Sequence, residues 1–430
     1  MADGPCARRI SFSKMSLSQV EGMRARPIVQ VIILGCFATG CGAHSERSAP
    51  STGDSAAIPT SPTSLATAGS AGGDTNTDQV KAWALESAPA DWRTSPSPDI
   101  PIVAGLTEVV AVQESRGDYE SLASVESVTS SAVTYSFSVR SGSVNGMASN
   151  RARRVVPRRD MEVARGYRMT FSSADAESFP GQTAVGISAA LYRELHDRGQ
   201  SRLDLYASTD VVAAVASILS TLGAEGSDLS GELTRVEPEP VGVPVLVNGR
   251  RVWLPALHAK GEFQRIDRAV VVEFWFFADP RNPITLRAAV DSARLQVVRI
   301  DFPAEEAART LERALAEREP VEMWGVYFEF GSARLTPESM TVIDNVASVL
   351  RRHPDWRIRI DGHTDNVGSE ADNLRLSQQR ADAVRAELAR RVGDDGSRLT
   401  VAGYGAAQPR EPNTTLSGRA RNRRVELVRQ

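Results

Sequence analysis

The chain has 430 residues, of which 41% are apolar and 24% are charged, and its formal net charge is −3. This length is too great for one compact core, so we expect two or more domains. The small net charge gives no global attraction to nucleic acid or to anionic lipid. All 3 cysteines lie within the first 41 residues, so the folded domains need no disulfide.

Residues 1–40 are interpreted as a signal peptide of the lipoprotein type. Two arginines precede a short apolar run, which is followed by the small residues 38–40 and then by Cys41. The run is too short to span a bilayer comfortably, and its layout is that of a secretory signal. Met23 is an alternative start, because it would remove a long polar segment that is unusual before such a run.

The residues before Cys41 resemble a bacterial lipobox, in which the cysteine is lipidated and the peptide is cut before it. The resemblance implies Cys41 as the lipidation site, although Ala38 stands where lipoboxes usually carry Leu. Cys36 is a competing site, and a plain signal peptide is the alternative. Gly42 rather than Asp follows the cysteine, which by the same resemblance favours a lipid anchor in the outer membrane, facing the periplasm.

Residues 41–98 are dominated by Ser, Thr, Ala, Gly and Pro and show no apolar period, so we expect a disordered tether. A coil of about 50 residues has an end-to-end distance of roughly 35–45 Å. Trp83 and Trp92 are expected to mark where order begins.

Residues 99–302 are predicted to form a β-rich domain with one or two helices, at 188–198 and 210–222. Short β-branched and aromatic segments are bounded there by turn residues, and Asn248-Gly249 is typical of a tight hairpin turn. No catalytic, phosphate-binding or metal-binding motif is found, so His196 and His258 are interpreted as core or surface histidines.

The segment "RARRVVPRRD", residues 151–160, holds five arginines. It is interpreted as a solvated loop or edge strand, with binding of an anionic glycan, lipid or protein as the alternative. The β-rich domain resembles no family that we can name, and a protein partner is one role that remains open for it.

Residues 303–320 are predicted to be a connector helix with Leu311 and Leu315 on its apolar face. Residues 321–430 show a β-α-β-α-β rhythm, with a strand at 324–330, a helix capped by Thr336, and a second helix over about 376–391. The fold class expected for the whole chain is α+β.

Five motifs in the C-terminal part occur in a fixed order: "VYFEFGSARLTPES", "IRIDGHTDNVGS", "NLRLSQQRADAVRAEL", "VAGYGAAQP" and "GRARNRRVEL". Together they resemble the OmpA-like peptidoglycan-binding domain and cover nearly the whole of residues 321–430. The resemblance implies a β-α-β-α-β-β α/β sandwich that binds the diaminopimelate residue of the peptidoglycan stem. Gly331 departs from the family pattern, where many members carry Asp, which puts the pocket geometry in question.

The free end of diaminopimelate is a zwitterion, so its ammonium needs a carboxylate and its carboxylate needs a guanidinium fork. By resemblance, Asp365 receives the amine and Arg380, one turn inside its helix, receives the carboxylate. Thr364, Asn373 and Leu376 match pocket-lining positions of the family. Arg423 and Arg424 match its last-strand motif, where one holds the ligand or the pocket loop and the other is structural. His363 is not expected to bind metal.

These features predict a non-enzymatic envelope lipoprotein that joins the outer membrane to peptidoglycan, with no cofactor and no metal. The alternative is an envelope assembly or secretion-system component whose residues 99–302 bind a protein partner. A flagellar stator subunit is disfavoured because such proteins need a transmembrane helix. An enzyme acting on peptidoglycan is disfavoured because no catalytic constellation is recognised.

Overall fold

The protein is described by a computed structural model. It describes residues 83–430 apart from 95, 115–116, 139–150, 172–174, 208–228, 266–267, 304–306, 330 and 394–396. These residues belong to one compact unit, Ala71–Gln430. Cys36, Cys41 and the helix expected at 210–222 lie outside the described residues.

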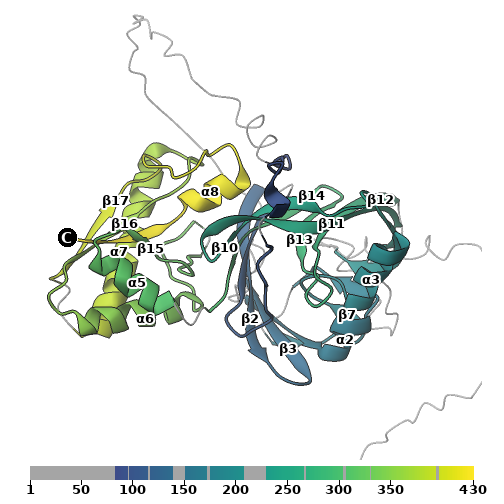
Figure 1. The fold of residues 1–430 in the computed structure, drawn as a ribbon, viewed down its shortest axis with the longest axis horizontal. Coiled ribbons are helices and arrows are strands. Elements are labelled where there is room, and N and C mark those ends of the chain that lie inside the picture. Colours follow the sequence, from purple (N-terminus) through teal and green to yellow (C-terminus); the bar gives the residue numbers. More distant parts are fainter. Residues whose placement is uncertain are drawn as a thin grey trace, which may run out of the picture. The chain divides into compact units, whose positions relative to one another are not determined.

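The first part of this unit is a 14-stranded sheet that curls over the helix α3, as Figure 1 shows. The sheet order is β6-β4-β3-β2-β1-β14-β13-β12-β11-β9-β8-β5-β7, and β10 pairs with both β11 and β14. The strands are β1 (Thr107–Glu114), β2 (Gly117–Val128), β3 (Ala132–Ser138), β4 (Arg151–Pro157), β5 (Gly166–Arg168), β6 (Ala176–Glu177), β7 (Gln182–Thr183), β8 (Gln200–Tyr206), β9 (Leu229–Arg235), β10 (Val241–Val247), β11 (Arg250–Gln264), β12 (Ala269–Phe277), β13 (Thr285–Val290) and β14 (Ala293–Asp301). A β-rich region before the C-terminal domain is therefore confirmed.

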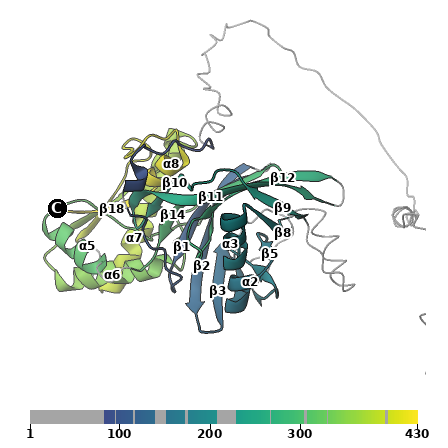
Figure 2. The same ribbon diagram turned by 45° about the vertical axis from the view of Figure 1, so that its right-hand side comes forward.

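Helices in this region are short: η2 (Trp92–Thr94), α2 (Arg158–Val163) and α3 (Ala189–Arg198). The helix α3 begins where the Ser188 side chain accepts a hydrogen bond from the backbone N–H of Leu191, and it ends at Gly199, whose φ is 76°. Leu191 and Leu195 pack on the inner face of the sheet, which Figure 2 shows behind α3.

The hairpin between β10 and β11 turns at Asn248 and Gly249, whose φ values are 43° and 74°. Positive φ at two successive turn residues is what a tight hairpin requires, and Asn-Gly is the pair that adopts it most readily. The hairpin predicted from the sequence is therefore present in the structure.

The C-terminal part contains α5 (Ala307–Ala316), β15 (Val321–Glu322), α6 (Ser339–Arg352), β16 (Ile358–Gly362), α7 (Glu370–Val392), β17 (Leu399–Gly403), α8 (Leu416–Asn422) and β18 (Val425–Arg429). Its four strands follow the order β15-β18-β16-β17, and only the pair β16–β17 is parallel. Ile343, Ile358 and Leu388 are fully buried between the sheet and helices α6 and α7. Leu315 of the connector α5 packs on the same core, so the connector belongs to this domain.

Four local expectations differ from the structure of this domain, and the fourth, the start of α7, is described below. The expected strand at 324–330 is not formed over its described residues 324–329: Gly325 has φ 78°, and only a single bridge joins Phe328 to Leu335. The helix α6 has Glu338 as its N-cap without a side-chain cap bond, so Thr336 is not the cap. A further helix, α8, precedes the last strand.

The helix α7 begins six residues earlier than expected, at Glu370. Its N-cap is Ser369, whose side chain accepts a hydrogen bond of 3.1 Å from the N–H of Asp372. The first two turns carry mostly polar residues, so they lack the apolar stripe that identifies a helix. Arg380 consequently lies in the third turn of α7, deeper than the one turn expected from the sequence.

Buried polar contacts connect the β-rich region to the C-terminal domain. Arg299 of β14 forms an ion pair of 3.1 Å with Glu322 of β15, and the Tyr327 hydroxyl donates to Asp301. Both Arg299 and Arg421 stack on the ring of Trp324. Burial raises the pKa of Glu322 to about 7. We call these residues the buried junction.

Candidate functional site

The loop between β16 and α7, residues 363–369, is held close to the helix. A Cβ atom at Gly362 would collide with the carbonyl oxygen of Ser377, so only glycine lets the strand end approach α7 this closely. Gly368 has φ 94°, which glycine tolerates at the turn into the helix. The loop and the middle of α7 are therefore fixed with respect to one another.

Asp365 lies within this loop with only 10% of its side chain exposed. Its Oδ1 accepts a hydrogen bond of 3.0 Å from the N–H of Val367. Its Oδ2 is in an ion pair with Nη1 of Arg423, at the end of α8. The carboxylate that the resemblance assigns to the ligand amine is therefore already paired with a guanidinium from the last motif.

Arg380 reaches the same place from α7. Its Nε donates a hydrogen bond of 3.1 Å to the carbonyl of Ser332, and its guanidinium lies 4.9 Å from the centre of the Phe328 ring. Burial lowers its pKa to about 10, an effect opposed by Glu120 and Asp365 and reinforced by Arg423. Arg380 still carries its charge at neutral pH. No carboxylate among the described residues forms an ion pair with it.

The other residues implied by the resemblance divide into two kinds. Thr364 is buried, and its hydroxyl has no hydrogen-bond partner among the described residues. Asn373 is also buried, but its amide donates 3.1 Å to the carbonyl of Val367 and so holds the loop. Leu376 is half-buried on α7. An unpartnered buried hydroxyl indicates a place for a further polar group.

Of the two arginines in the last motif, Arg423 contacts the site and Arg424 does not. Arg424 is buried in an ion pair with Glu426 and donates 3.2 Å to the carbonyl of Gln408. Arg423 bridges Asp365 and Glu120, a residue of β2 that lies 303 positions away in the chain. Nothing in the sequence signals Glu120, because its place depends on how two regions pack.

His363 lies beside the site and is stacked on Tyr404, with ring centres 5.1 Å apart. Burial lowers its pKa to about 4, so the ring is neutral at neutral pH. Across the described residues, no group of three or more His, Cys, Asp or Glu side chains could hold a metal ion. Gly331 has φ 62° with open space where a side chain would begin.

The arginine-rich segment of the β-rich region is mostly paired within the protein. Arg151 is paired with Glu338 of the C-terminal domain, Arg153 with Glu126, and Arg154 with Glu177. His258 is likewise enclosed, between Glu237 and Glu273 at 2.8 Å each, and stacks on Trp275. His196 is exposed beside Asp197.

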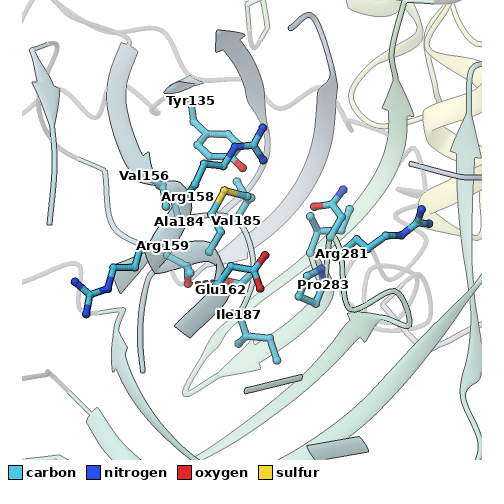
Figure 3. Close-up of a pocket in the computed structure, with 15 residues that line it drawn as sticks. Tyr135, Val156, Arg158, Arg159, Glu162, Ala184, Val185, Ile187, Arg281 and Pro283 are labelled. Atoms are coloured by element: carbon cyan, nitrogen blue, oxygen red, sulfur yellow. Dashed lines mark hydrogen bonds between the residues drawn. The ribbon is translucent and has the colours of Figure 1, made fainter. Parts of the chain in front are cut away.

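A separate cavity of about 230 Å³ lies in the β-rich region, and Figure 3 shows the residues that line it. Tyr135 and Ile187 line it at opposite ends, and Arg159 and Arg281 extend away on opposite sides. Arg281 is paired with Asp279 and Asp99. This cavity contains none of the residues of the candidate site around Asp365.

Comparisons with known proteins bear on the C-terminal domain. Outer membrane porin F of Pseudomonas aeruginosa is 40% identical over 113 residues, which is 26% of this chain and 32% of that protein. The probable lipoprotein YiaD of Escherichia coli is 42% identical over 103 residues, 24% of this chain and 47% of that protein. The peptidoglycan-binding protein ArfA of Mycobacterium tuberculosis is 42% identical over 103 residues, 24% of this chain and 31% of that protein.

The chain thus spans about a third to a half of the length of these curated relatives. Among solved structures, the peptidoglycan-associated lipoprotein from Burkholderia pseudomallei is 33% identical, with 24% of this chain and 88% of that chain covered and a TM-score of 0.23. Within the described ranges, no helix is long and apolar enough to cross a membrane. The model of the OmpA family matches residues 327–423, and this part of the chain is an OmpA family domain.

Proposed function

We propose that the protein is a non-enzymatic lipoprotein of the cell envelope that binds the diaminopimelate stem of peptidoglycan non-covalently. The observation that carries this proposal is the guanidinium of Arg380. It is largely buried and stacked on Phe328, yet no described carboxylate forms an ion pair with it. A fixed, charged fork without an ion-pair partner is suited to a ligand carboxylate.

The second charge of the ligand is assigned to Asp365. A ligand ammonium would share this carboxylate with Arg423, and the unpartnered hydroxyl of Thr364 lies next to it in the chain. Two charge-assisted contacts contribute about 1.5–3 kcal/mol each before the costs of desolvation and ordering. We therefore expect a dissociation constant in the micromolar range or weaker for a free stem peptide.

Attachment to a membrane makes a weak site sufficient. A protein held near polymeric peptidoglycan meets its ligand at high effective concentration, so that modest affinity gives a durable link. We propose that lipid on Cys41 supplies this attachment at the outer membrane, facing the periplasm. The names of two relatives, an outer membrane porin and a probable lipoprotein, are in keeping with this location.

The test of the site is co-sedimentation of the protein with purified sacculi. The double substitution Asp365→Ala with Arg380→Ala is expected to abolish pelleting while leaving the domain folded. A matched control is Asp372→Ala with Arg375→Ala, which removes an exposed ion pair of 2.6 Å from the same helix. Pelleting of the Asp365/Arg380 double variant at the level of the control would show that these residues do not form the site.

The test of the anchor is metabolic labelling with a palmitate analogue. The wild type is expected to be labelled, and Cys41→Ala is expected to lose the label and to leave the membrane fraction. Label that persists in Cys41→Ala and disappears in Cys36→Ala would move the anchor to the competing cysteine. The alternative in which residues 99–302 dock a protein partner stays a prediction.

A further inference from the structure

A carboxylate from the β-rich region lies at the stem-peptide site. Glu120 of β2 is in an ion pair with Arg423, which in turn is paired with Asp365. The charge of Glu120 also opposes the effect of burial on the pKa of Arg380, and it does so more strongly than that of Asp365. Glu120 therefore acts on both guanidinium groups of the site.

The position of Glu120 is fixed by the sheet and by the buried junction. Its strand β2 pairs with β1, where Glu120 lies opposite Ala111, and β1 pairs with β14. The strand β14 carries Arg299 and Asp301, which bind Glu322 and Tyr327 of the C-terminal domain. Glu120 is thus presented to the site from a strand that is connected to the OmpA family domain.

Four charged side chains meet at this place: the carboxylates of Asp365 and Glu120 and the guanidinium groups of Arg380 and Arg423. Their charges sum to zero before any ligand binds. A zwitterionic ligand brings a carboxylate of the same chemistry as Glu120 toward the same guanidinium groups. With 32% of its side chain exposed, Glu120 remains accessible to a ligand from solvent.

We propose that Glu120 is a specificity-determining residue of the stem-peptide site, where its carboxylate competes with the ligand carboxylate for Arg380 and Arg423. This inference rests on the proposed function of the site. A diaminopimelate residue whose free carboxylate is a carboxamide avoids the like-charge repulsion and can donate a hydrogen bond to Glu120. Glu120 therefore reduces the difference between the affinities for the free-carboxylate stem and the amidated stem.

The experiment is calorimetric titration of the full chain with two synthetic stem tripeptides. One ends in diaminopimelate with its free carboxylate, and the other carries a carboxamide in its place. Glu120→Gln is expected to bind the free-carboxylate peptide roughly tenfold more tightly than the wild type, because a nearby like charge is removed. The amidated peptide is expected to change less than twofold.

Two further variants isolate the charge at this position. Glu120→Asp keeps the carboxylate and is expected to bind as the wild type does. Glu126→Gln removes a carboxylate of the same 32% exposure from the same strand, where it is paired with Arg153, and it is expected to leave both affinities unchanged. Thermal unfolding of each variant reports whether the fold is retained.

Other outcomes would overturn the inference. Weaker binding of the free-carboxylate peptide by Glu120→Gln would mean that Glu120 binds the ammonium group of the ligand. Binding equal to that of the wild type would mean that Glu120 has no effect on affinity. If Glu120→Gln binds both peptides more tightly by the same factor, Glu120 does not act through the ligand carboxylate. If the wild type and every variant fail to bind either peptide, the proposed function itself falls, and this inference falls with it.

Discussion

Two arginines, one in each region of the molecule, lie against aromatic rings, although Arg154 is buried and Arg380 is half-buried. Arg154 of β4 stacks on Phe179 at 4.6 Å, and Arg380 of α7 stacks on Phe328 at 4.9 Å. Burial lowers the pKa of each to about 10. Yet Arg154 forms an ion pair with Glu177, whereas Arg380 donates only to a backbone carbonyl among the described residues.

The difference shows that burial alone does not identify a binding residue. A buried guanidinium is costly unless a carboxylate compensates for its lost hydration. The β-rich region supplies that carboxylate within its own fold, so Arg154 is structural. The OmpA family domain provides no described carboxylate as an ion-pair partner for the guanidinium of Arg380. The charge of Glu120 offsets part of the free energy lost on burial, and a ligand carboxylate would offset more.

Truncating the two arginines tests this contrast most directly. Arg154→Ala leaves Glu177 without its partner and is expected to lower the free energy of unfolding by about 4 kcal/mol. Arg380→Ala is expected to leave stability nearly unchanged and to weaken stem-peptide binding by about 2 kcal/mol. Chemical denaturation and calorimetric titration measure the two effects. A large loss of stability in Arg380→Ala would mean that Arg380 stabilises the fold, as Arg154 does.

Glu108 offers a test of the comparison, because it is a buried carboxyl group of the β-rich region without an ion-pair partner among the described residues. Burial raises its pKa from 4.5 to about 8, so the native state keeps a proton that the unfolded state releases above pH 4.5. The stability of the wild type therefore falls as the pH rises from 5 to 8, by about 3 kcal/mol from this group.

Glu108→Gln removes that dependence, because a carboxamide does not ionise. Denaturation curves at pH 5, 6, 7 and 8 should converge at low pH and separate at high pH, with the variant more stable. Glu322, whose pKa is also raised, titrates in both proteins and cancels in the difference. Parallel curves would mean that Glu108 is ionised in the native state, so that the β-rich region also keeps an uncompensated charge.

Arg380→Lys sharpens the comparison from the other side. A lysine keeps the positive charge but loses the planar fork and its stacking on Phe328. Binding of the stem peptide is expected to weaken about tenfold, or about 1.4 kcal/mol. Wild-type affinity in this variant would mean that the site uses charge alone and needs no bidentate geometry.

The smallest change in stability is expected at the helix N-caps. Each region has a helix that begins at a serine cap. Ser369 caps α7 beside the site, and Ser188 caps α3 in the β-rich region. Each change to Ala is expected to cost about 1 kcal/mol of stability. Only Ser369→Ala is expected to weaken peptide binding as well, because the cap holds the end of the loop that carries Asp365. Equal binding by both variants would show that the cap does not position the loop.

The resemblance of the five motifs predicted the candidate site in the C-terminal domain, and the chemistry of its loop is local. Gly362, Gly368 and the polar residues between them signal a tight connection, and the structure places Asp365 there. The start of α7 was placed six residues too late because its first turns carry few apolar residues. Ser369, a residue type that favours the N-cap position, indicates the observed start of α7.

Other features could not be predicted because they depend on contacts between distant segments. Short alternating segments predicted strands in the β-rich region, but the pairing of β1 with β14 is a long-range event that leaves no local pattern. In the sequence, Glu120 has the pattern of a solvent-exposed strand residue. Only the packing of β2 beside Arg423 shows its contact with the candidate site. Glu120, the fourth charged side chain of the candidate site, is placed there by tertiary packing alone.

The contacts of Trp83 and Glu86 have a mechanical consequence for the proposed link. Trp83 is buried in one cluster with Tyr327 and Leu416 of the OmpA family domain, and Arg287 donates to its carbonyl. Glu86 accepts a hydrogen bond of 2.6 Å from Ser417. If the chain is anchored at Cys41 as proposed, a pull on that anchor would act at Trp83 and Glu86, which contact the OmpA family domain. Because Trp83 also packs on Val109 of β1 and Val298 of β14, the β-sheet would share the load with the OmpA family domain in the proposed link.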